Sequence, residues 1–513
     1  TILIHKSEIF LQAMDTVKMA QKLKSNVVVS HHEDYTVGQT TGGLSVFFTI
    51  LCIVDLFGVF PVVALPKPII ACGLYGIPLI FSVFGLQIYT AVLLGRCWIL
   101  AKELAPQIGE KNRYPYAAVA ELAFGRRARQ AVVFLIDATV FGAGVPNLLV
   151  ASQSLQLFWW KITGGGVGVS FCVWMVVIGL LLCPVMWLGS PKDMKSLAIA
   201  SVFIVTTVAI STWVCIAQDN VSPPGSALQH QPSVQDFLVA YGIIAFQFDI
   251  HPMLLTIQVD MKDSKKINIA VLLGFMVTGI MFAVTSLLAA YRYGQHVDSN
   301  ILQGIPASIP LYVVALLVTL QLCLSSAVGN SALFQHVEDL LRIPREFSIQ
   351  RCLLRSSIVA LAVFLGEAVP RFDLVMGLVG STLTGPLMFI FPPIFFLKLC
   401  QMKSNVKYEF LNSSNFKNQN GGLNFPLKNL QTQYRTFSNI IEDSDNEMCV
   451  FEHRVNWLDV ILASSVMVLG IMATIVATYS NWSDAISYAN FSPPCLVNAT
   501  AAARSFLQTA RAI

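Results

Sequence analysis

Residues 245–261 read Ala245-Phe-Gln-Phe-Asp-Ile-His-Pro-Met-Leu-Leu-Thr-Ile-Gln-Val-Asp-Met261, and they interrupt a hydrophobic segment that is long enough to cross a bilayer. Asp249 and His251 stand near the middle of that segment, where an acid costs roughly 2.5–3.5 kcal/mol on membrane-insertion scales. Pro252 removes one backbone donor, which membrane helices tolerate where protein or a water-filled cavity covers the gap. An ionisable pair on a weakened backbone at membrane depth predicts a functional site.

Composition places the chain among membrane proteins. Of its 513 residues, 55% are hydrophobic and 12% are charged, which is about half the charged fraction of a soluble domain. Apolar windows of about twenty residues recur along the chain, without the alternating pattern of barrel strands. We therefore expect an all-α polytopic membrane protein with eleven transmembrane helices, near 43–66, 73–98, 130–158, 168–189, 196–217, 236–257, 268–291, 308–335, 352–370, 374–398 and 456–479.

Basic residues orient these helices. Every second interval between them is rich in Lys and Arg, and the alternate intervals hold only Lys67, Lys161, Arg292 and Arg371. Cytoplasmic loops carry the excess of positive charge, so we expect the N-terminus in the cytoplasm. With eleven helices, the C-terminus is then extracellular or lumenal.

The rest of the chain divides around a ten-helix core. We expect this core over 41–400, with two repeats near 43–217 and 236–398, and an eleventh helix over 455–480. Polar composition predicts a cytoplasmic tail over 1–40 and a cytoplasmic loop over 401–454. The last segment, 481–513, is the predicted outer tail.

Two glycosylation sequons agree with this topology. Asn481-Trp-Ser and Asn498-Ala-Thr both follow the last predicted helix, on its outer side. Such tripeptides also arise by chance, so Asn481 and Asn498 are candidate glycosylation sites. Cys72 and Cys495 are expected on the same side, where a disulfide between them is an open alternative to two free thiols.

The first predicted helix is interrupted as well. It is apolar from Gly43 to Val54, then meets Asp55-Leu-Phe-Gly-Val-Phe-Pro61 before the apolar run resumes. Two helices broken near mid-span and five helices apart indicate an inverted five-plus-five repeat, with the breaks meeting at the midplane. Exposed half-helix ends offer N–H groups to a carboxylate and carbonyls to an ammonium. These ends favour a small zwitterion, and the predicted substrate-binding residues are Leu56, Phe57, Gly58, Val59, Phe60, Val62, Ala245, Phe246 and Phe248.

Several alternatives stay open at this point. Gly and Pro also kink membrane helices for packing alone. Asp249 and His251 are candidates for carrying a coupled proton, or they cap a half-helix and make a structural hydrogen bond. Asp55 is a third coupling candidate, which either holds an ion or pairs with a basic group. Asp137 in the third predicted helix faces the same choice, and a satisfied buried acid is favoured there.

Enzyme chemistry has no support in the sequence. It contains no G-x-S-x-G, H-E-x-x-H or Walker motif, and no dinucleotide fingerprint on a strand. We expect no enzyme activity, no metal, no cofactor and no nucleic-acid partner. A transmembrane proton gradient is the expected driving force.

The helix-6 string Phe246-Gln-Phe-Asp-Ile-His-Pro-Met-Leu-Leu-Thr-Ile-Gln-Val-Asp-Met261 resembles the amino acid/auxin permease family, and its vacuolar and vesicular-type animal branch in particular. Val63-Ala-Leu-Pro66, Tyr114-Pro-Tyr116, Ala123-Phe-Gly125, Gly380-Ser-Thr-Leu-Thr-Gly-Pro386 and Phe391-Pro-Pro393 carry the same resemblance. It implies a LeuT-type fold and secondary transport of amino acids, often driven by protons. It also implies a plasma, lysosomal, vacuolar or vesicular membrane.

One departure from the family pattern concerns the first broken helix. Where the family has a Gly-x-Gly turn before Ala-Leu-Pro, this chain has Val59-Phe60-Pro61, and Gly58 comes one place earlier. Pro61 supplies no N–H. The leading hypothesis is a proton-coupled amino acid transporter that works by alternating access around helices 1 and 6. The alternative is a non-transporting membrane receptor or regulatory protein that keeps the transporter fold.

Overall fold

A computed structural model describes residues 43–109, 114–163, 169–187, 194–219, 231–344, 347–369, 371–419 and 457–488. From Leu44 onward these residues belong to one compact unit, Leu44–Ile513. The predicted cytoplasmic tail, most of the loop over 401–454 and the end of the outer tail lie outside the described residues.

The described part of the unit is built from helices. The first half of the chain contributes α2 (Val46–Phe57), α3 (Phe60–Val63), α4 (Pro66–Ala71), η1 (Gly73–Tyr75), α5 (Gly76–Leu104), η2 (Pro106–Gly109), α6 (Pro115–Phe124), α7 (Arg126–Ile162), α8 (Phe171–Trp187) and α9 (Met194–Gln218). The second half contributes α10 (Val234–Gln247), α11 (His251–Asp260), η3 (Ser264–Lys266), α12 (Ile267–Tyr293), η4 (Gly294–His296), α13 (Ile301–Gly304), α14 (Ile309–Leu340), α15 (Ile349–Ala368), α16 (Phe372–Val379), η5 (Gly380–Thr384), η6 (Pro386–Ile390), α17 (Phe391–Gln419) and α19 (Trp457–Tyr488).

These helices confirm the predicted membrane architecture. Within the described residues, 9 are long and apolar enough to cross a membrane, and two shorter apolar helices, α2 and α8, fall on the other two predicted segments. Many large apolar side chains remain exposed on the outer faces of these helices, as expected for a surface in contact with lipid. The protein is an integral, multi-pass membrane protein.

The predicted ends of the tenth and eleventh helices differ most from the structure. The tenth predicted helix ends at 398, whereas α17 continues to Gln419; the eleventh ends at 479, whereas α19 continues to Tyr488. Apolar windows detect only the part of a helix that lies in lipid, and a helix continues into polar sequence without such a signal. A surface ion pair between Lys403 and Glu103, with N and O 2.7 Å apart, joins the extended part of α17 to α5.

Three of the transmembrane segments are interrupted. The first stops at Phe57 and restarts as α3, with Gly58 at φ 59° between the two parts. The sixth stops at Gln247 and restarts at His251. The tenth passes from α16 through two π-helical turns, η5 and η6, before α17, and π-helical turns are frequent at functional sites.

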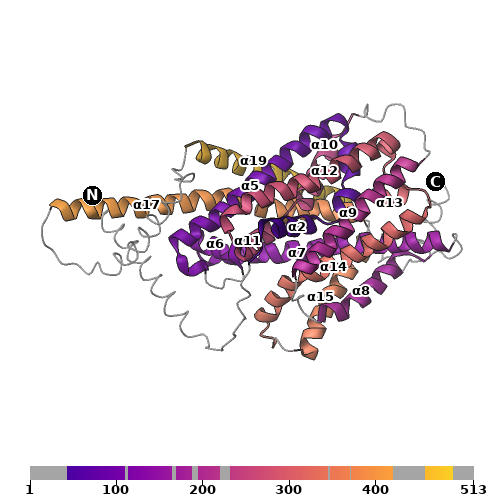
Figure 1. Cartoon of the computed structure of the whole chain (residues 1–513), viewed down its shortest axis with the longest axis horizontal. Helices are drawn as coiled ribbons and strands as arrows, with labels where there is room; N and C mark the ends of the chain where they lie inside the picture. Colours follow the sequence, from indigo (N-terminus) through magenta and orange to yellow (C-terminus); the bar gives the residue numbers. More distant parts are fainter. Residues whose placement is uncertain are drawn as a thin grey trace. The chain divides into compact units, whose positions relative to one another are not determined.

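Helix packing places the first and sixth segments, called the two broken segments below, inside the bundle. Short α2 packs against α12 and α9, and α10 packs against α16 and η5. The long helices α7 and α14 pack against each other, and Figure 1 shows them side by side. Helix α19 packs against α10, α17 and η6.

Glycines fix the crossing of α10 over the tenth segment. A Cβ added to Gly380 would lie 1.9 Å from the carbonyl oxygen of Gly242, and one added to Gly242 would lie 2.7 Å from that of Gly377. Only glycine allows two backbones to approach this closely. The crossing holds the break at the end of α10 against the π-helical turn η5.

The cysteines decide one alternative that the sequence leaves open. Cys72 is a free thiol whose sulfur donates to the carbonyl of Asp236, which excludes the possible disulfide with Cys495, a residue that lies outside the described part of the chain. Cys172, at the start of α8, is disulfide-bonded instead. The spacing of cysteines in a sequence does not determine their connectivity.

Candidate functional site

The two broken segments meet where their first halves end. Gln247, the last residue of α10, donates from Nε2 to the carbonyl oxygen of Phe57, the last residue of α2, at 2.7 Å. The next residue, Phe248, places its ring 5.2 Å from that of Phe57, centroid to centroid. The C-terminal ends of both half-helices, where unpaired carbonyls concentrate, therefore face one shared region.

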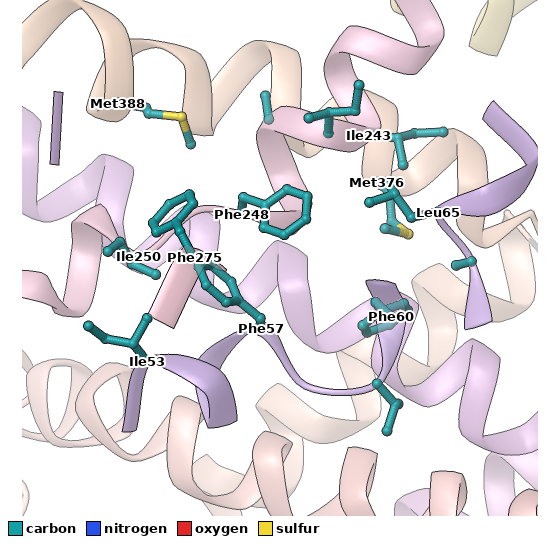
Figure 2. Packing of buried hydrophobic residues seen from close by; sticks show 14 of the residues in the cluster. Ile53, Phe57, Phe60, Leu65, Ile243, Phe248, Ile250, Phe275, Met376 and Met388 are labelled. Carbon is teal, nitrogen blue, oxygen red and sulfur yellow. The ribbon is translucent and has the colours of Figure 1, made fainter. Parts of the chain in front are cut away.

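Four aromatic rings form one wall of this region. Phe57 and Phe248 contact Phe275 of α12, with ring centroids 4.9 and 6.1 Å away, and Phe84 of α5 completes the group. Most of these pairs are edge-to-face, the arrangement that aromatic quadrupoles favour. Figure 2 shows Phe57, Phe248 and Phe275 turned toward one another beside the break that follows Phe57. This wall is apolar and closely packed.

The predicted substrate-binding residues occupy different positions around the breaks. Phe57, Gly58, Val59, Phe60, Val62, Ala245 and Phe248 are buried, Phe246 is partly buried, and Leu56 is exposed. Phe60 lies beyond the break and apart from the Phe57–Phe248 pair, as Figure 2 shows. The structure therefore brings Phe57 and Phe248 together and turns the Leu56 side chain away.

Asp249 lies in the second break and His251 begins the helix that follows it, and both side chains are buried. The backbone N–H of His251 donates to Oδ1 of Asp249 at 3.1 Å, and the His251 Nδ1 lies 3.4 Å from the same oxygen. That second distance is too long for a good hydrogen bond. Among the residues that the structure describes, Nδ1 of His251 and Oδ2 of Asp249 make no hydrogen bond of good geometry, and Thr384 of η5 lies beside the carboxyl. Each of these atoms can accept a proton.

Thr90 of α5 holds the other side of the imidazole. Its Oγ1 lies 3.1 Å from Nε2 of His251 and donates to the carbonyl oxygen of Leu86 at 3.0 Å. In the tautomer that carries the proton on Nε2, the hydroxyl donates to a carbonyl of its own helix and Oγ1 accepts from Nε2–H. This leaves Nδ1 of His251 as the basic atom, and it faces Asp249.

Asp55 and Asp137 stand in separate surroundings. The Asp55 carboxyl lies on α2 before the first break and faces Ser201 of α9. The Asp137 carboxyl on α7 pairs with Nδ1 of His336 on α14, and both side chains are partly exposed. Asp137 therefore has a partner, which agrees with the satisfied acid that the sequence favours.

Two glutamines at the breaks were missed by the sequence analysis. In the sequence, Gln247 stands out only as part of the family string, and no motif marks Gln321 of α14. Gln321 is 1% exposed, and a Cβ added to Gly58 would lie 3.0 Å from its Nε2. The signal that could have found it is a lone carboxamide in the apolar centre of a membrane helix.

A separate cleft lies away from the breaks, among α7, α8, α14 and α15. Its cavity volume is about 20 Å³, and its lining includes the polar side chains of Ser326 and Asn330 among apolar ones. Ser326 accepts from the amide of Asn147 at 3.1 Å. The small polar residues of α7 and α14 therefore join these two helices, as packing predicts.

Asn481 occupies a position that does not suit a glycan. It lies inside α19, is 3% exposed, and its amide donates to the carbonyl oxygen of Ala477 at 2.9 Å and toward Ser381 at 3.4 Å. A glycan needs an exposed acceptor, so the burial argues against modification here. Asn498 lies outside the described residues.

Comparison with known proteins is consistent with this geometry. A family model described as "Transmembrane amino acid transporter protein" matches residues 43–416. Amino acid transporter AVT1B from Arabidopsis thaliana is 23% identical over 402 residues, which cover 75% of this chain and 69% of the relative. Sodium-coupled neutral amino acid transporter 4 from Pongo abelii is 28% identical over 172 residues, 32% of this chain and 31% of the relative.

A solved structure shares the fold. The crystal structure of MhsT in complex with L-phenylalanine matches with a TM-score of 0.50 and 12% sequence identity, and it covers 88% of this chain and 100% of that chain. The likeness confirms the LeuT-type fold that the family resemblance implies.

Proposed function

We propose, from the premise that this chain belongs to the transmembrane amino acid transporter family, that it is a secondary active transporter coupled to protons. As a member of a transporter family it is not an enzyme. In this proposal an amino acid binds at the breaks of α2 and α10–α11, and the two sides of the membrane gain access to it alternately.

The contact between Gln247 and Phe57 is the observation that carries the proposal. It joins the C-terminal ends of α2 and α10 across the bundle, at 2.7 Å. Helix C-termini and unwound carbonyls attract an ammonium or a cation, and the N-termini of the following half-helices favour a carboxylate. A substrate that contacts both breaks stabilises one arrangement of the half-helices over another, which is what alternating access requires.

Asp249 and His251 are the proposed coupling groups. Their facing atoms, Oδ1 and Nδ1, are 3.4 Å apart and buried, so a proton placed on His251 meets a carboxylate without crossing water. The pair belongs to the joint between α10 and α11. A change in its charge therefore acts on the backbone that has to move. Asp55, on the other broken helix, is a second candidate for the coupled proton or ion.

We also propose the orientation and the kind of membrane. The distribution of Lys and Arg supports a cytoplasmic N-terminus and an extracellular or lumenal C-terminus. The family resemblance supports a plasma membrane or a lysosomal, vacuolar or vesicular membrane.

Uptake into proteoliposomes tests the function. The purified full chain is reconstituted, and each of the twenty labelled amino acids is offered under a pH gradient of either direction, then under a sodium gradient at equal pH. Uptake that follows the proton gradient supports the proposal. Uptake driven only by sodium would contradict proton coupling and would show that sodium is the coupled ion. The Pongo abelii relative is named as a sodium-coupled transporter.

The receptor hypothesis is the competing outcome. It is motivated by Val59-Phe60-Pro61, where Pro61 removes a backbone donor, and by the closely packed rings of Phe57 and Phe248. Specific binding of an amino acid with no uptake under any of these gradients would contradict transport and favour a receptor.

A further inference from the structure

Gln321 is a buried polar side chain that has nothing to bind within the described residues. It lies in the apolar middle of α14 and is 1% exposed, and neither its Nε2 nor its Oε1 has a hydrogen-bond partner. Leaving a buried carboxamide unpaired costs about 1–3 kcal/mol for each polar group. Buried polar groups are usually satisfied, so the two polar atoms of Gln321 are candidates for binding a substrate.

The side chain is aimed at the break of α2. A Cβ added to Gly58 would lie 3.0 Å from Nε2 and 3.4 Å from Oε1 of Gln321. Gly58 has φ 59°, a conformation that side chains rarely adopt. The absence of a side chain at Gly58 thus lets the carboxamide of α14 approach the unwound backbone directly.

A second carboxamide reaches the adjacent residue from the opposite broken helix. Gln247 donates from Nε2 to the carbonyl oxygen of Phe57 at 2.7 Å, and its Oε1 has no partner among the described residues. The hydrogen bond fixes the amide plane and leaves the oxygen as a free acceptor. Gln247 and Gln321 therefore present one free donor group and two free acceptors beside two consecutive residues, Phe57 and Gly58.

These groups match the main-chain charges of an amino acid. A carboxylate accepts from an amide N–H, and an ammonium donates to an amide oxygen and to helix carbonyls. Pro61, which follows the first break, has no N–H to offer a carboxylate. The wall beside Phe57 is aromatic, so it suits a neutral side chain.

We propose that Gln321 and Gln247 form the recognition site for the main-chain groups of a neutral amino acid. Nε2 of Gln321 donates to the substrate carboxylate, and Oε1 of Gln247 accepts from its ammonium. This proposal rests on the proposed function for the substrate class. It adds two binding residues that the breaks alone do not identify.

Binding and uptake measured on the same variants test it. The probes are L-alanine, L-leucine and L-phenylalanine, each labelled, with the corresponding amino acid amides as competitors. An amide keeps the ammonium and replaces the carboxylate with a neutral group. The variants are Gln321→Met, which keeps the volume without the amide, and Gln321→Glu, which opposes the carboxylate. Gln156→Met is the matched control, because this buried glutamine donates to the carbonyl oxygen of Val169, on the segment leading into α8.

We expect Gln321→Met to weaken binding of the free amino acid about tenfold to a hundredfold, the loss expected for a hydrogen bond to a charged group. Binding of the amide changes less than threefold, and Gln321→Glu weakens the free acid further while sparing the amide. Gln156→Met leaves the ratio of acid to amide unchanged.

Each remaining outcome decides the question. If acid and amide weaken equally in Gln321→Met, or neither weakens, Gln321 does not contact the carboxylate and the proposal is wrong. If Gln321→Met fails to fold, the ratio in Gln321→Glu decides in the same way. Binding with this pattern but without uptake overturns the proposed transport and leaves the recognition site intact. Absence of binding in the unmodified protein overturns the recognition site.

Discussion

Nδ1 of His251 lies 3.4 Å from Oδ1 of Asp249, and both side chains are buried at the joint between α10 and α11. The pair is close enough for charge to matter and too far apart for a good hydrogen bond. A small movement of the joint would either close or open this gap. Proton transfer and helix movement can therefore depend on each other here.

Asp249→Asn tests whether the carboxylate is required for coupling. An amide cannot take up the proton, so we expect loss of uptake driven by a pH gradient, whereas exchange of amino acid at equal pH is partly kept. Labelled uptake and exchange in the same proteoliposomes measure both. Asp373→Asn is the control, since Asp373 forms a surface pair with Arg371 at 2.9 Å. If Asp249→Asn keeps the pH dependence of the unmodified protein, the proton is carried elsewhere, with Asp55 the next candidate.

Thr90→Val tests whether the orientation of His251 matters. The change keeps the shape of the side chain and removes the oxygen that lies 3.1 Å from Nε2 of His251. A buried N–H left without an acceptor costs about 1–3 kcal/mol, so we expect proton-driven uptake to fall about fivefold or more. Initial rates at acidic and neutral external pH measure the effect. Thr206→Val is the control variant, because the Thr206 hydroxyl on α9 donates to the carbonyl oxygen of Val202 in its own helix. Equal losses of uptake in the two variants would contradict a role for Thr90 in orienting His251.

Gly58→Ala tests the geometry of the first break. The backbone there has φ 59°, and the new methyl group would lie 3.0 Å from Nε2 of Gln321. Strain of about 1–3 kcal/mol is expected, with a lower melting temperature and reduced uptake. In Gly329→Ala, on α14, the methyl group meets nothing within 4 Å, and the helix gains up to about 1 kcal/mol. A Gly58→Ala protein as stable and active as Gly329→Ala would show that the break tolerates a side chain.

Much of the fold could be predicted from the sequence because apolar length and helix breaks are local signals. The run of about twenty apolar residues located each span, and Gly58 and Pro252 marked two of the interruptions. The ends of α17 and α19 could not be predicted in this way, since helices continue into polar sequence. The π-helical turns η5 and η6 carry no periodic pattern that distinguishes them from α-helix.

The site could be predicted only in part, because contacts between distant segments decide it. Asp249 and His251 were identified from their cost in a membrane helix. Thr90 could not be identified in this way. A threonine whose hydroxyl bonds only to its own helix and a threonine that also contacts a histidine look alike in sequence. Gln321 carries no charge and therefore gives a weaker signal than an acid. The burial of Asn481 against Ser381 was likewise invisible in the sequon. Sequence marks costly residues, and structure shows which of them meet.

Cysteine labelling at the two ends of α12 tests the proposed orientation. Lys265 precedes this helix and His296 follows it, and both are exposed. The positive charge around Lys265 predicts that it lies in the cytoplasm. In inside-out vesicles we expect a membrane-impermeant maleimide to label Lys265→Cys and not His296→Cys, and the reverse in right-side-out vesicles. Labelling of the unmodified protein measures the background from its native cysteines. The opposite labelling pattern would show that the proposed orientation is wrong.

The buried ion pair between Glu338 and Arg355 offers a test of what stabilises the α14–α15 contact. Nε of Arg355 lies 2.6 Å from Oε1 of Glu338, both side chains are almost fully buried, and Nε of Arg351 lies 3.2 Å from the same oxygen. Arg355 also donates to the carbonyl oxygen of Met186 on α8. The pair therefore connects three helices.

Arg355→Met removes the closer partner of Glu338 and leaves only Arg351 beside the buried carboxylate. Breaking a buried pair costs up to about 3–5 kcal/mol when no partner remains, so we expect a smaller but clear fall in the melting temperature of the detergent-solubilised protein. Adding Glu338→Gln removes the weakly paired charge and should restore part of the loss, which a double-mutant cycle measures. Lys403→Met breaks the exposed pair with Glu103 and should cost less than about 1 kcal/mol. If the double variant is as unstable as the sum of its single changes, the two side chains act independently and packing around Arg355 stabilises the contact.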